Sequence, residues 1–217
     1  MTKNIITLID ANSSVSEAYR ALRTNIIFAD KKERLRVILV CGASPENNSD
    51  SKSYVTANLA VTLAQSGRKT LIMDCDLRHP NQHDIWGVPN EFGLSSTLIS
   101  NDIVNKLDVG VDNLSIVTSG PTPKNPADLL GSNNMDRLMV DLSQQADFVL
   151  LDSPPVLPVT DAAILSSYAD GVIVVLNSGQ SRRDHLERAS EILNQSGARV
   201  IGAVLNNAPV DLSVGSY

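Results

Sequence analysis

A lysine and a serine follow the first strongly apolar stretch of the chain. Residues 37–41 have the composition of a buried strand, residues 42–51 form a polar loop, and a helix is expected over about 54–65. Lys52 and Ser53 stand between that loop and that helix. Lys52 and the helical amides would attract phosphate oxygens, and the hydroxyl of Ser53 would suit magnesium. These residues therefore suit the binding of a triphosphate.

Three aspartates follow two other apolar stretches. Asp74 and Asp76 come after residues 70–73, and Asp152 comes after residues 148–151. In a parallel sheet the carboxyl ends of strands meet at one edge, so we expect these carboxylates to converge with Lys52. One of them would hold magnesium, another would orient or deprotonate an attacking hydroxyl, and Arg78 would pair with a carboxylate or a phosphate. Each residue alone also fits a turn or a helix start, but their joint placement favours a nucleotide site.

The order of the expected elements indicates the fold. Apolar strands without polar alternation alternate with helices, which predicts an α/β fold with a doubly wound, mostly parallel sheet and helices on both faces, like a P-loop NTPase. We expect one domain over residues 1–217, with an N-terminal helix within residues 1–30 and a flexible tail at 208–217. Residues 1–13 look extended, Ser14 and Glu17 form a capping-box pattern, and residues 98–107 are a candidate short helix.

Composition excludes several classes of protein. The formal net charge of −6 and the pI near 5.0 disfavour a nucleic-acid binder. No apolar run approaches the roughly 20 residues that span a bilayer, and the N-terminus, Met1-Thr2-Lys3-Asn4, has no signal-peptide h-region, which predicts a cytoplasmic protein. The two cysteines, Cys41 and Cys75, end apolar stretches and are expected to be small core residues.

Several motifs resemble those of the bacterial tyrosine kinases (BY-kinases). These are P-loop ATPases of the MinD/ParA-like superfamily that act in capsule and exopolysaccharide synthesis. The resemblance extends from about Ser16 to Asn207, and the combination of motifs in this order is specific. The motifs are Glu-x-x-Arg-x-x-Arg within residues 17–26, and segments 57–60, 74–80, 120–130, 151–155, 160–162 and 202–206.

The resemblance implies transfer of the γ-phosphate of ATP to tyrosine, with Mg²⁺ as cofactor. Catalysis is assigned to Asp74 as base, with Lys52 and Arg78. Magnesium is assigned to Ser53, Asp76 and Asp152. The nucleotide is assigned to Ser51, Lys52, Ser53, Tyr54 and Asn206.

The resemblance also implies partners. Glu17, Arg20 and Arg23 would form an intersubunit contact in a homo-oligomeric ring, although their spacing alone favours a solvated face with local ion pairs. The cytoplasmic tail of a membrane adaptor would recruit the kinase to the inner face of the membrane. Tyr217 would be the sole tail acceptor, or else other proteins would supply the tyrosines; no nucleic-acid partner is expected.

The phosphate loop departs from the family pattern. Ser51 replaces the glycine before the lysine, and no glycine lies between Gly42 and Lys52, although a phosphate cradle needs positive φ and close backbone approach. We therefore expect weakened ATP affinity. One alternative is a weakened or non-catalytic scaffold that binds the adaptor and kinase subunits. Another is a MinD/ParA-like positioning ATPase, which would need a second, signature lysine that is missing between Arg34 and Lys52.

Overall fold

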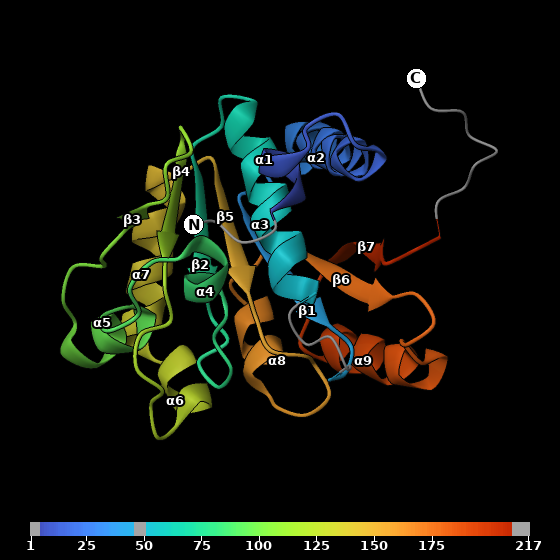
Figure 1. Ribbon diagram of the computed structural model, residues 1–217. Coiled ribbons are helices and arrows are strands. Elements are labelled where there is room, and N and C mark those ends of the chain that lie inside the picture. Colours follow the sequence, from blue (N-terminus) through green and yellow to red (C-terminus); the bar gives the residue numbers. More distant parts are fainter. Residues whose placement is uncertain (1–4, 46–50, 210–217) are drawn as a thin grey trace.

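The protein folds around one seven-stranded sheet with the order β3-β4-β2-β5-β1-β6-β7 (Figure 1). The computed structural model describes residues 5–45 and 51–209. The strands are β1 (Val37–Gly42), β2 (Thr70–Asp74), β3 (Leu107–Asp108), β4 (Leu114–Val117), β5 (Phe148–Asp152), β6 (Gly171–Asn177) and β7 (Val200–Asn206). Every described pairing is parallel except that of β3 with β4, so the predicted mostly parallel sheet is confirmed.

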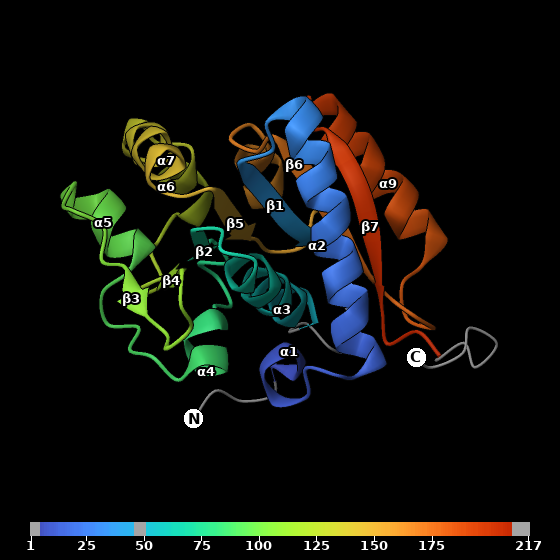
Figure 2. The same ribbon diagram turned by 90° about the horizontal axis from the view of Figure 1, so that it is seen from above.

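Helices cover both faces of the sheet (Figure 2). On one face lie α1 (Ile6–Ile9), α2 (Ser14–Glu33), α3 (Ser51–Gln65) and α4 (Gln82–Trp86). On the other lie α5 (Leu94–Ser100), α6 (Pro126–Leu130), α7 (Asn133–Gln145), α8 (Asp161–Ser166) and α9 (Arg183–Gln195). Alternate residues of β1 serve the two layers: Leu39 packs with the second group and Ile38 with the first.

The central strands bring distant segments into register. Val40 of β1 pairs with Asp152 of β5, and Asp74 of β2 pairs with the same Asp152. Residues 37–42 and 148–152 are almost entirely buried and aliphatic, as expected for strands that are covered on both faces. The ends of β1, β2 and β5 therefore lie at one edge of the sheet. Cys41 and Cys75 are both buried and free, which confirms their predicted place in the core.

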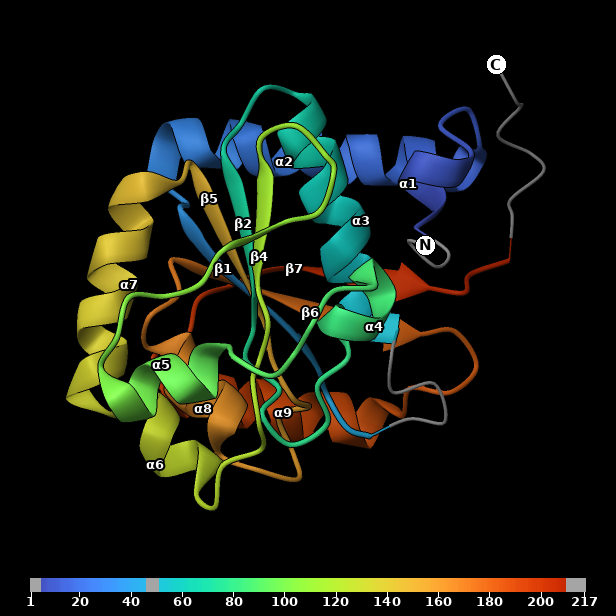
Figure 3. The ribbon, with the colours of Figure 1, turned by 60° about the vertical axis from the view of Figure 1, so that its left-hand side comes forward.

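The first residues are not an extended lead-in as predicted. Residues 6–9 form the short helix α1, which lies beside α2 and α3 (Figure 3). The backbone N–H and the hydroxyl of Thr7 both donate to Asn58 Oδ1 of α3, each at 3.0 Å. Sequence periodicity gives no sign of this helix, because four residues are too few to show a pattern and a tertiary contact fixes the segment.

The predicted cap of α2 is displaced by one residue. The hydroxyl of Ser13, rather than that of Ser14, accepts the backbone N–H of Ser16 at 3.2 Å. Glu17 lies in the first turn and pairs with Arg20 instead of closing a capping box. The N-terminus of α2 is nevertheless capped by a serine, as its sequence leads one to expect.

The predicted helix at 98–107 is also wrong. The helix of this region is α5 at Leu94–Ser100, and residues 107–108 form the antiparallel edge strand β3. The N–H groups of Leu94 and Ser95 donate to the carbonyls of Thr118 and Ser119, which fixes the start of α5 beside the end of β4. Asn101, with a φ of 57°, ends the helix.

None of the helices in the described ranges is long and apolar enough to cross a membrane. The tail from residue 210 onward, including Tyr217, and loop residues 46–50 lie outside the described residues.

Candidate phosphoryl-transfer site

Lys52 is the centre of a buried charge cluster. Lys52 occupies the first turn of α3, and only 6% of its surface is exposed to solvent. Its Nζ lies 3.0 Å from Asp76 Oδ2 and 3.7 Å from Asp152 Oδ1. The predicted convergence of these strand-end residues is therefore confirmed, while their chemical roles remain to be tested.

Lys52 is charged in this environment. Burial lowers the pKa of Lys52, but the negative charges of Asp152 and Asp76 outweigh burial and hold that pKa above its ordinary value. The lysine thus serves as the local counter-ion of the carboxylates. Loss of this ammonium would leave several acidic groups buried together without a cation.

Asp74 is enclosed by backbone donors. One carboxylate oxygen accepts the N–H of Asp76 at 3.2 Å, and the other accepts those of Asn81 at 3.2 Å and Gln82 at 3.0 Å. Burial raises the pKa of Asp74 well above its ordinary range, and the charge of Asp152 acts in the same direction. Strand β2 ends at Asp74, so Asp76 lies beyond the strand and the two side chains are not aligned by strand geometry.

Asp76 belongs to the turn that follows β2. Its Oδ2 is the oxygen that faces Lys52, and its Oδ1 accepts the backbone N–H of His79 at 3.0 Å. This pair of contacts holds the side chain over the first turn of α3. Asp76 therefore presents its charge to the same space as Lys52.

Asp152 ends β5 and is fully buried. Its Oδ2 accepts Gln82 Nε2 at 2.7 Å. Among the residues that the structure describes, its Oδ1 has no hydrogen-bond partner; the ammonium of Lys52 lies 3.7 Å from it, and the side chain of Ser53 lies close to the carboxylate. Burial raises the pKa of Asp152, and the charge of Lys52 opposes that effect. A buried carboxylate oxygen without a donor is a natural ligand for a cation.

The cluster suits Mg²⁺ that arrives with a nucleotide. Within residues 5–45 and 51–209, no three acidic, histidine or cysteine side chains are placed to hold a metal ion by themselves. Magnesium in phosphate-transfer sites is usually held by one or two carboxylates together with substrate phosphates. Asp76, Asp152 and the buried hydroxyl of Ser53 supply oxygen ligands of this kind.

Arg78 forms its ion pair with an aspartate outside the cluster around Lys52. Its guanidinium makes a two-pronged ion pair with Asp161 at the start of α8, with distances of 2.8 Å and 3.0 Å. Asp161 is fully buried, whereas the side chain of Arg78 is 33% exposed. The carboxylate that Arg78 pairs with is thus Asp161 rather than Asp74 or Asp76, its expected role toward phosphate stays a prediction, and Arg78 ties the loop after β2 to α8.

The remaining nucleotide residues lie at different places. Ser51 Oγ accepts Asn177 Nδ2 at 2.8 Å, which joins the start of α3 to the end of β6. Asn206 ends β7 and is half-buried; its carbonyl accepts the N–H of Ser178 at 2.9 Å. Tyr54 packs partly buried against the core beneath α3.

Sequence reasoning missed Gln82, Asn177 and Asp161 as members of this region. Gln82 contacts Asp152 across 70 residues of sequence, and Asp161 contacts Arg78 across 83. No local pattern marks Gln82 or Asn177. Asp161 lies in one of the motifs quoted above, but its partner becomes evident only in the folded chain.

The oligomerisation residues make local contacts in the monomer. Arg20 pairs with Glu17 at 2.7 Å and donates to the carbonyl of Ala11 at 2.7 Å. Arg23 donates to the carbonyl of Thr62 on α3 at 3.3 Å. These contacts shape the surface of α2, and they leave its use in assembly a prediction.

A pocket of about 370 Å³ opens beside the charge cluster. Lys52, Ser53 and Asp76 form its polar side, and Arg78 and His79 lie near them. The rest of the wall is largely proline, from Pro45, Pro154, Pro155 and Pro158. A flat, apolar wall next to charged groups suits an aromatic side chain with a polar tip.

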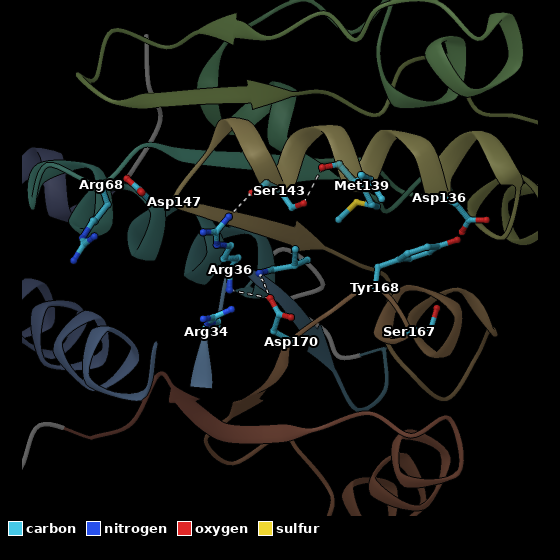
Figure 4. A pocket seen from close by; sticks show the side chains of 12 residues that line it. Arg34, Arg36, Arg68, Asp136, Met139, Ser143, Asp147, Ser167, Tyr168 and Asp170 are labelled. Atoms are coloured by element: carbon cyan, nitrogen blue, oxygen red, sulfur yellow. Dashed lines mark hydrogen bonds between the residues drawn. The ribbon is translucent and has the colours of Figure 1, made fainter. Parts of the chain in front are cut away.

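A second cavity, of about 1180 Å³, lies at the opposite edge of the sheet, where β1 begins (Figure 4). Its wall carries Arg34, Arg36 and Arg68, and also Asp136, Asp147 and Asp170. The three formal positive charges equal the three negative ones. The carboxylate of Asp170 accepts the backbone N–H groups of Arg36 and Val37, each at 2.8 Å, and so serves the start of β1. This cavity is separate from the cluster around Lys52.

Comparison with known proteins places the chain among nucleotide-binding proteins. A family model described as ParA, "NUBPL iron-transfer P-loop NTPase", matches residues 51–212. The chain is 35% identical to the putative tyrosine-protein kinase CapB of Staphylococcus aureus over 207 residues, 94% of this chain and 90% of the relative. It is 37% identical to the tyrosine-protein kinase YwqD of Bacillus subtilis over 209 residues, 95% of this chain and 86% of the relative.

Solved structures agree with these relatives. The chimerical protein CapA2B2 superposes with a TM-score of 0.89 at 36% identity, covering 95% of this chain and 90% of the other. The kinase domain of the Escherichia coli tyrosine kinase ETK superposes with a TM-score of 0.87 at 31% identity, and the match covers 96% of this chain and 83% of the other. The septum site-determining protein MinD of Pyrococcus horikoshii, complexed with Mg-ADP, gives 0.64 at 23% identity, covering 78% and 69%, a likeness of fold alone.

Proposed function

Because this chain belongs to the bacterial tyrosine-protein kinases, we propose that the cluster around Lys52 transfers the γ-phosphoryl group of ATP to tyrosine. The observation that carries the proposal is the buried ammonium of Lys52, held between Asp76 and Asp152 at the carboxyl edge of the sheet. Phosphoryl transfer needs positioned positive charge and little covalent chemistry from the protein. Lys52 supplies such charge at the start of α3.

The proposed roles follow from position. Lys52 and the first amides of α3 would bind phosphate oxygens, with Ser51 and Tyr54 in the same turns and Asn206 toward the base. Ser53, Asp76 and Asp152 would hold Mg²⁺, which when bound neutralises charge on the transferred group. If the ammonium of Lys52 moved from the carboxylates to the phosphates, the oxygens of Asp76 and Asp152 would become available to the metal.

Asp74 is the proposed general base. Its raised pKa suits a proton acceptor, but both oxygens now accept backbone N–H groups and the residue is fully buried. Contact with a tyrosine hydroxyl therefore requires the turn at residues 75–82 to open. The proline-lined pocket next to Asp76 would receive the tyrosine ring. Arg78, which also lines this pocket, would be held in place by its ion pair with Asp161.

We also propose the cellular setting. The chain would assemble as a homo-oligomeric ring through Glu17, Arg20 and Arg23, and would bind the cytoplasmic tail of a membrane adaptor that recruits it to the inner face of the membrane. Its activity would regulate capsular or exopolysaccharide synthesis and export. Tyr217 is the proposed tail acceptor, alongside tyrosines of other proteins.

Lys52→Met tests the activity. Purified protein with MgATP and an adaptor tail peptide should accumulate phosphotyrosine, and the variant should lose at least about 100-fold in rate, since the ammonium stabilises transferred charge. Asp74→Asn should also be strongly impaired. Lys69→Met, which removes an exposed lysine, is the control and should keep the wild-type rate.

Two results of this experiment would change the proposal. Phosphotyrosine that accumulates equally in Lys52→Met would move the site elsewhere. Wild-type protein that gives no phosphotyrosine with or without the adaptor tail would favour the scaffold. Calorimetry on the same samples would measure the affinity for MgATP, which we expect to be weaker than in P-loop proteins with an intact glycine-rich loop.

A further inference from the structure

Gln82 connects three parts of the proposed site. It is fully buried at the start of α4. Its Nε2 donates to Asp152 Oδ2 at 2.7 Å and to the carbonyl of Ser53 at 3.0 Å. Its Oε1 accepts Nε1 of Trp86 at 3.0 Å. Both hydrogens of the amide and its oxygen are thus used, which is the full complement expected of a well-placed buried amide.

The orientation of this amide is determined by its neighbours. Two acceptors, the carbonyl of Ser53 and the carboxylate of Asp152, stand on one side, and the indole N–H of Trp86 stands on the other. Turning the amide by 180° would place its oxygen against two acceptors and its NH₂ group against a donor. Gln82 therefore can present only N–H groups to Asp152.

The consequence concerns the two oxygens of Asp152. Gln82 occupies Oδ2, whereas Oδ1 has no hydrogen-bond donor within the described part of the chain and lies toward Lys52. A carboxylate that is held through one oxygen cannot rotate freely, so the direction of its other oxygen is set. Outer partners of this kind typically change metal affinity or activity by about 10- to 100-fold when removed.

We propose that Gln82 is a positioning residue that fixes Asp152 so that Oδ1 is directed at the cation bound with the nucleotide, and that Trp86 reports on this contact. The proposal rests on the proposed role of Asp152 as a magnesium ligand. Trp86 is the single tryptophan of the chain, and its indole is two hydrogen bonds away from the carboxylate. Its fluorescence should therefore respond to occupation of the site.

A Mg²⁺ titration tests the proposal without phosphoryl transfer. ADP affinity is measured by calorimetry at rising Mg²⁺ in wild type, Gln82→Met and the control Gln65→Met, which makes the same exchange at an exposed position of α3. We expect the Mg²⁺ midpoint to rise by about 10- to 100-fold in Gln82→Met only. ADP affinity without Mg²⁺ should change by less than about threefold, a split that general loosening of the fold would not give.

Two further measurements accompany the titration. The emission of Trp86 on adding Mg²⁺ and ADP should change in wild type, and the change should shift to the same higher Mg²⁺ range in Gln82→Met. Should Gln82→Met fail to fold, Gln82→Leu replaces it, because it also removes the donor to Asp152 without adding a buried charge. A thermal-unfolding cycle of Gln82→Met, Asp152→Asn and the double variant should give a combined Tm shift smaller than the sum.

The outcomes are distinct from those of the kinase assay. A folded Gln82 variant with the wild-type Mg²⁺ midpoint, or additive Tm shifts, would overturn the positioning role. Wild type without Mg²⁺-dependent ADP binding would overturn it too, because no cation would then use Asp152. Absence of phosphotyrosine, with Mg²⁺-dependent ADP binding intact, would contradict the proposed function and leave the role of Gln82 in place.

Discussion

At the scale of single residues, Cys41 shows how strongly the core controls a titratable group. It lies in β1 and is fully buried, with its sulfur 3.9 Å from the carbonyl oxygen of Ile173. Burial raises the pKa of the Cys41 thiol from 9.0 to about 12. The folded protein thus keeps this proton at pH values where the unfolded chain releases it.

We predict an alkaline loss of stability that Cys41→Ala reduces. Because the pKa of the Cys41 thiol is higher in the folded protein than in the unfolded chain, its contribution to the free energy of unfolding is fully present below pH 9. That contribution is lost as the pH rises toward 12. The free energy of unfolding should fall with pH in this window, and the slope in Cys41→Ala should be shallower by up to about 1.4 kcal/mol per pH unit. Urea unfolding between pH 7 and pH 10.5 measures both slopes.

The difference between wild type and Cys41→Ala at pH 7 serves as the reference for this experiment. At pH 7 the thiol is protonated in both states, so the difference there reports only the lost packing of the sulfur. If the free energy of unfolding fell equally steeply with pH in both proteins above pH 9, the raised pKa of Cys41 would be contradicted. Tyr19, whose pKa is also raised to about 12 by burial, contributes equally to both proteins and cancels.

The residues of the site differ in how far sequence could predict them. Lys52, Asp76 and Asp152 could be predicted to converge, because the ends of parallel strands must meet at one edge. Gln82 could not, since nothing in its neighbourhood distinguishes it from a surface glutamine. The partner of Arg78 could not be chosen either, because several aspartates were within conceivable reach before the loop after β2 was placed.

At the scale of elements, α1 is held by polar contacts that no propensity encodes. Asn58 is almost fully buried in α3, accepts two hydrogen bonds from Thr7 and donates to the carbonyl of Tyr54 at 2.8 Å. A side chain of α3 therefore supplies the hydrogen-bond acceptor that holds α1 in place. Short elements of this sort are defined by the surface on which they pack.

Asn58→Ala should lower the free energy of unfolding by about 2 kcal/mol, because it leaves the buried N–H of Thr7 without a partner. Thr7→Val removes only the hydroxyl bond and should cost about 1 kcal/mol. Urea denaturation followed by circular dichroism measures both. If Asn58→Ala cost no more than Thr7→Val, the backbone contact would not be the main attachment of α1.

Element prediction succeeded for the central strands and failed for segments near the edges. Short, fully apolar runs such as residues 148–151, bounded by turn residues, fit the buried strands of an α/β protein. The region of α5 depends on Gly93, where an added Cβ would lie 2.2 Å from the carbonyl oxygen of Thr118. That close approach of two backbone segments fixes where the helix begins, and it cannot be read from the local pattern.

At the scale of the whole molecule, the exposed face of α2 is the proposed contact between subunits. The side chains of Arg20 and Glu17 are 33% and 69% exposed, so their ion pair contributes only about 0.2–1 kcal/mol to the monomer. A larger role for these residues would have to come from another copy of the chain. Stability and assembly can therefore be separated experimentally.

Arg20→Ala should change the free energy of unfolding by less than about 1 kcal/mol while it abolishes the proposed ring. Light scattering coupled to gel filtration gives the mass, and Arg188→Ala, an exposed arginine of α9, is the matched control. A ring of unchanged mass in Arg20→Ala would exclude this arginine from the interface.

The ion pairs of Lys52 also bear on how ligands enter. Before any ligand arrives, the ammonium of Lys52 is the cation that lies between the carboxylates of Asp76 and Asp152. In the proposed site, Mg²⁺ and nucleotide would replace this cation: Lys52 would serve the phosphates, and Asp76 and Asp152 would hold the metal. Nucleotide without metal would draw the ammonium away and leave Asp76 and Asp152 uncompensated, and metal without nucleotide would compete with a lysine that has nowhere else to go. If the proposed roles hold, each ligand would strengthen the binding of the other by thermodynamic linkage.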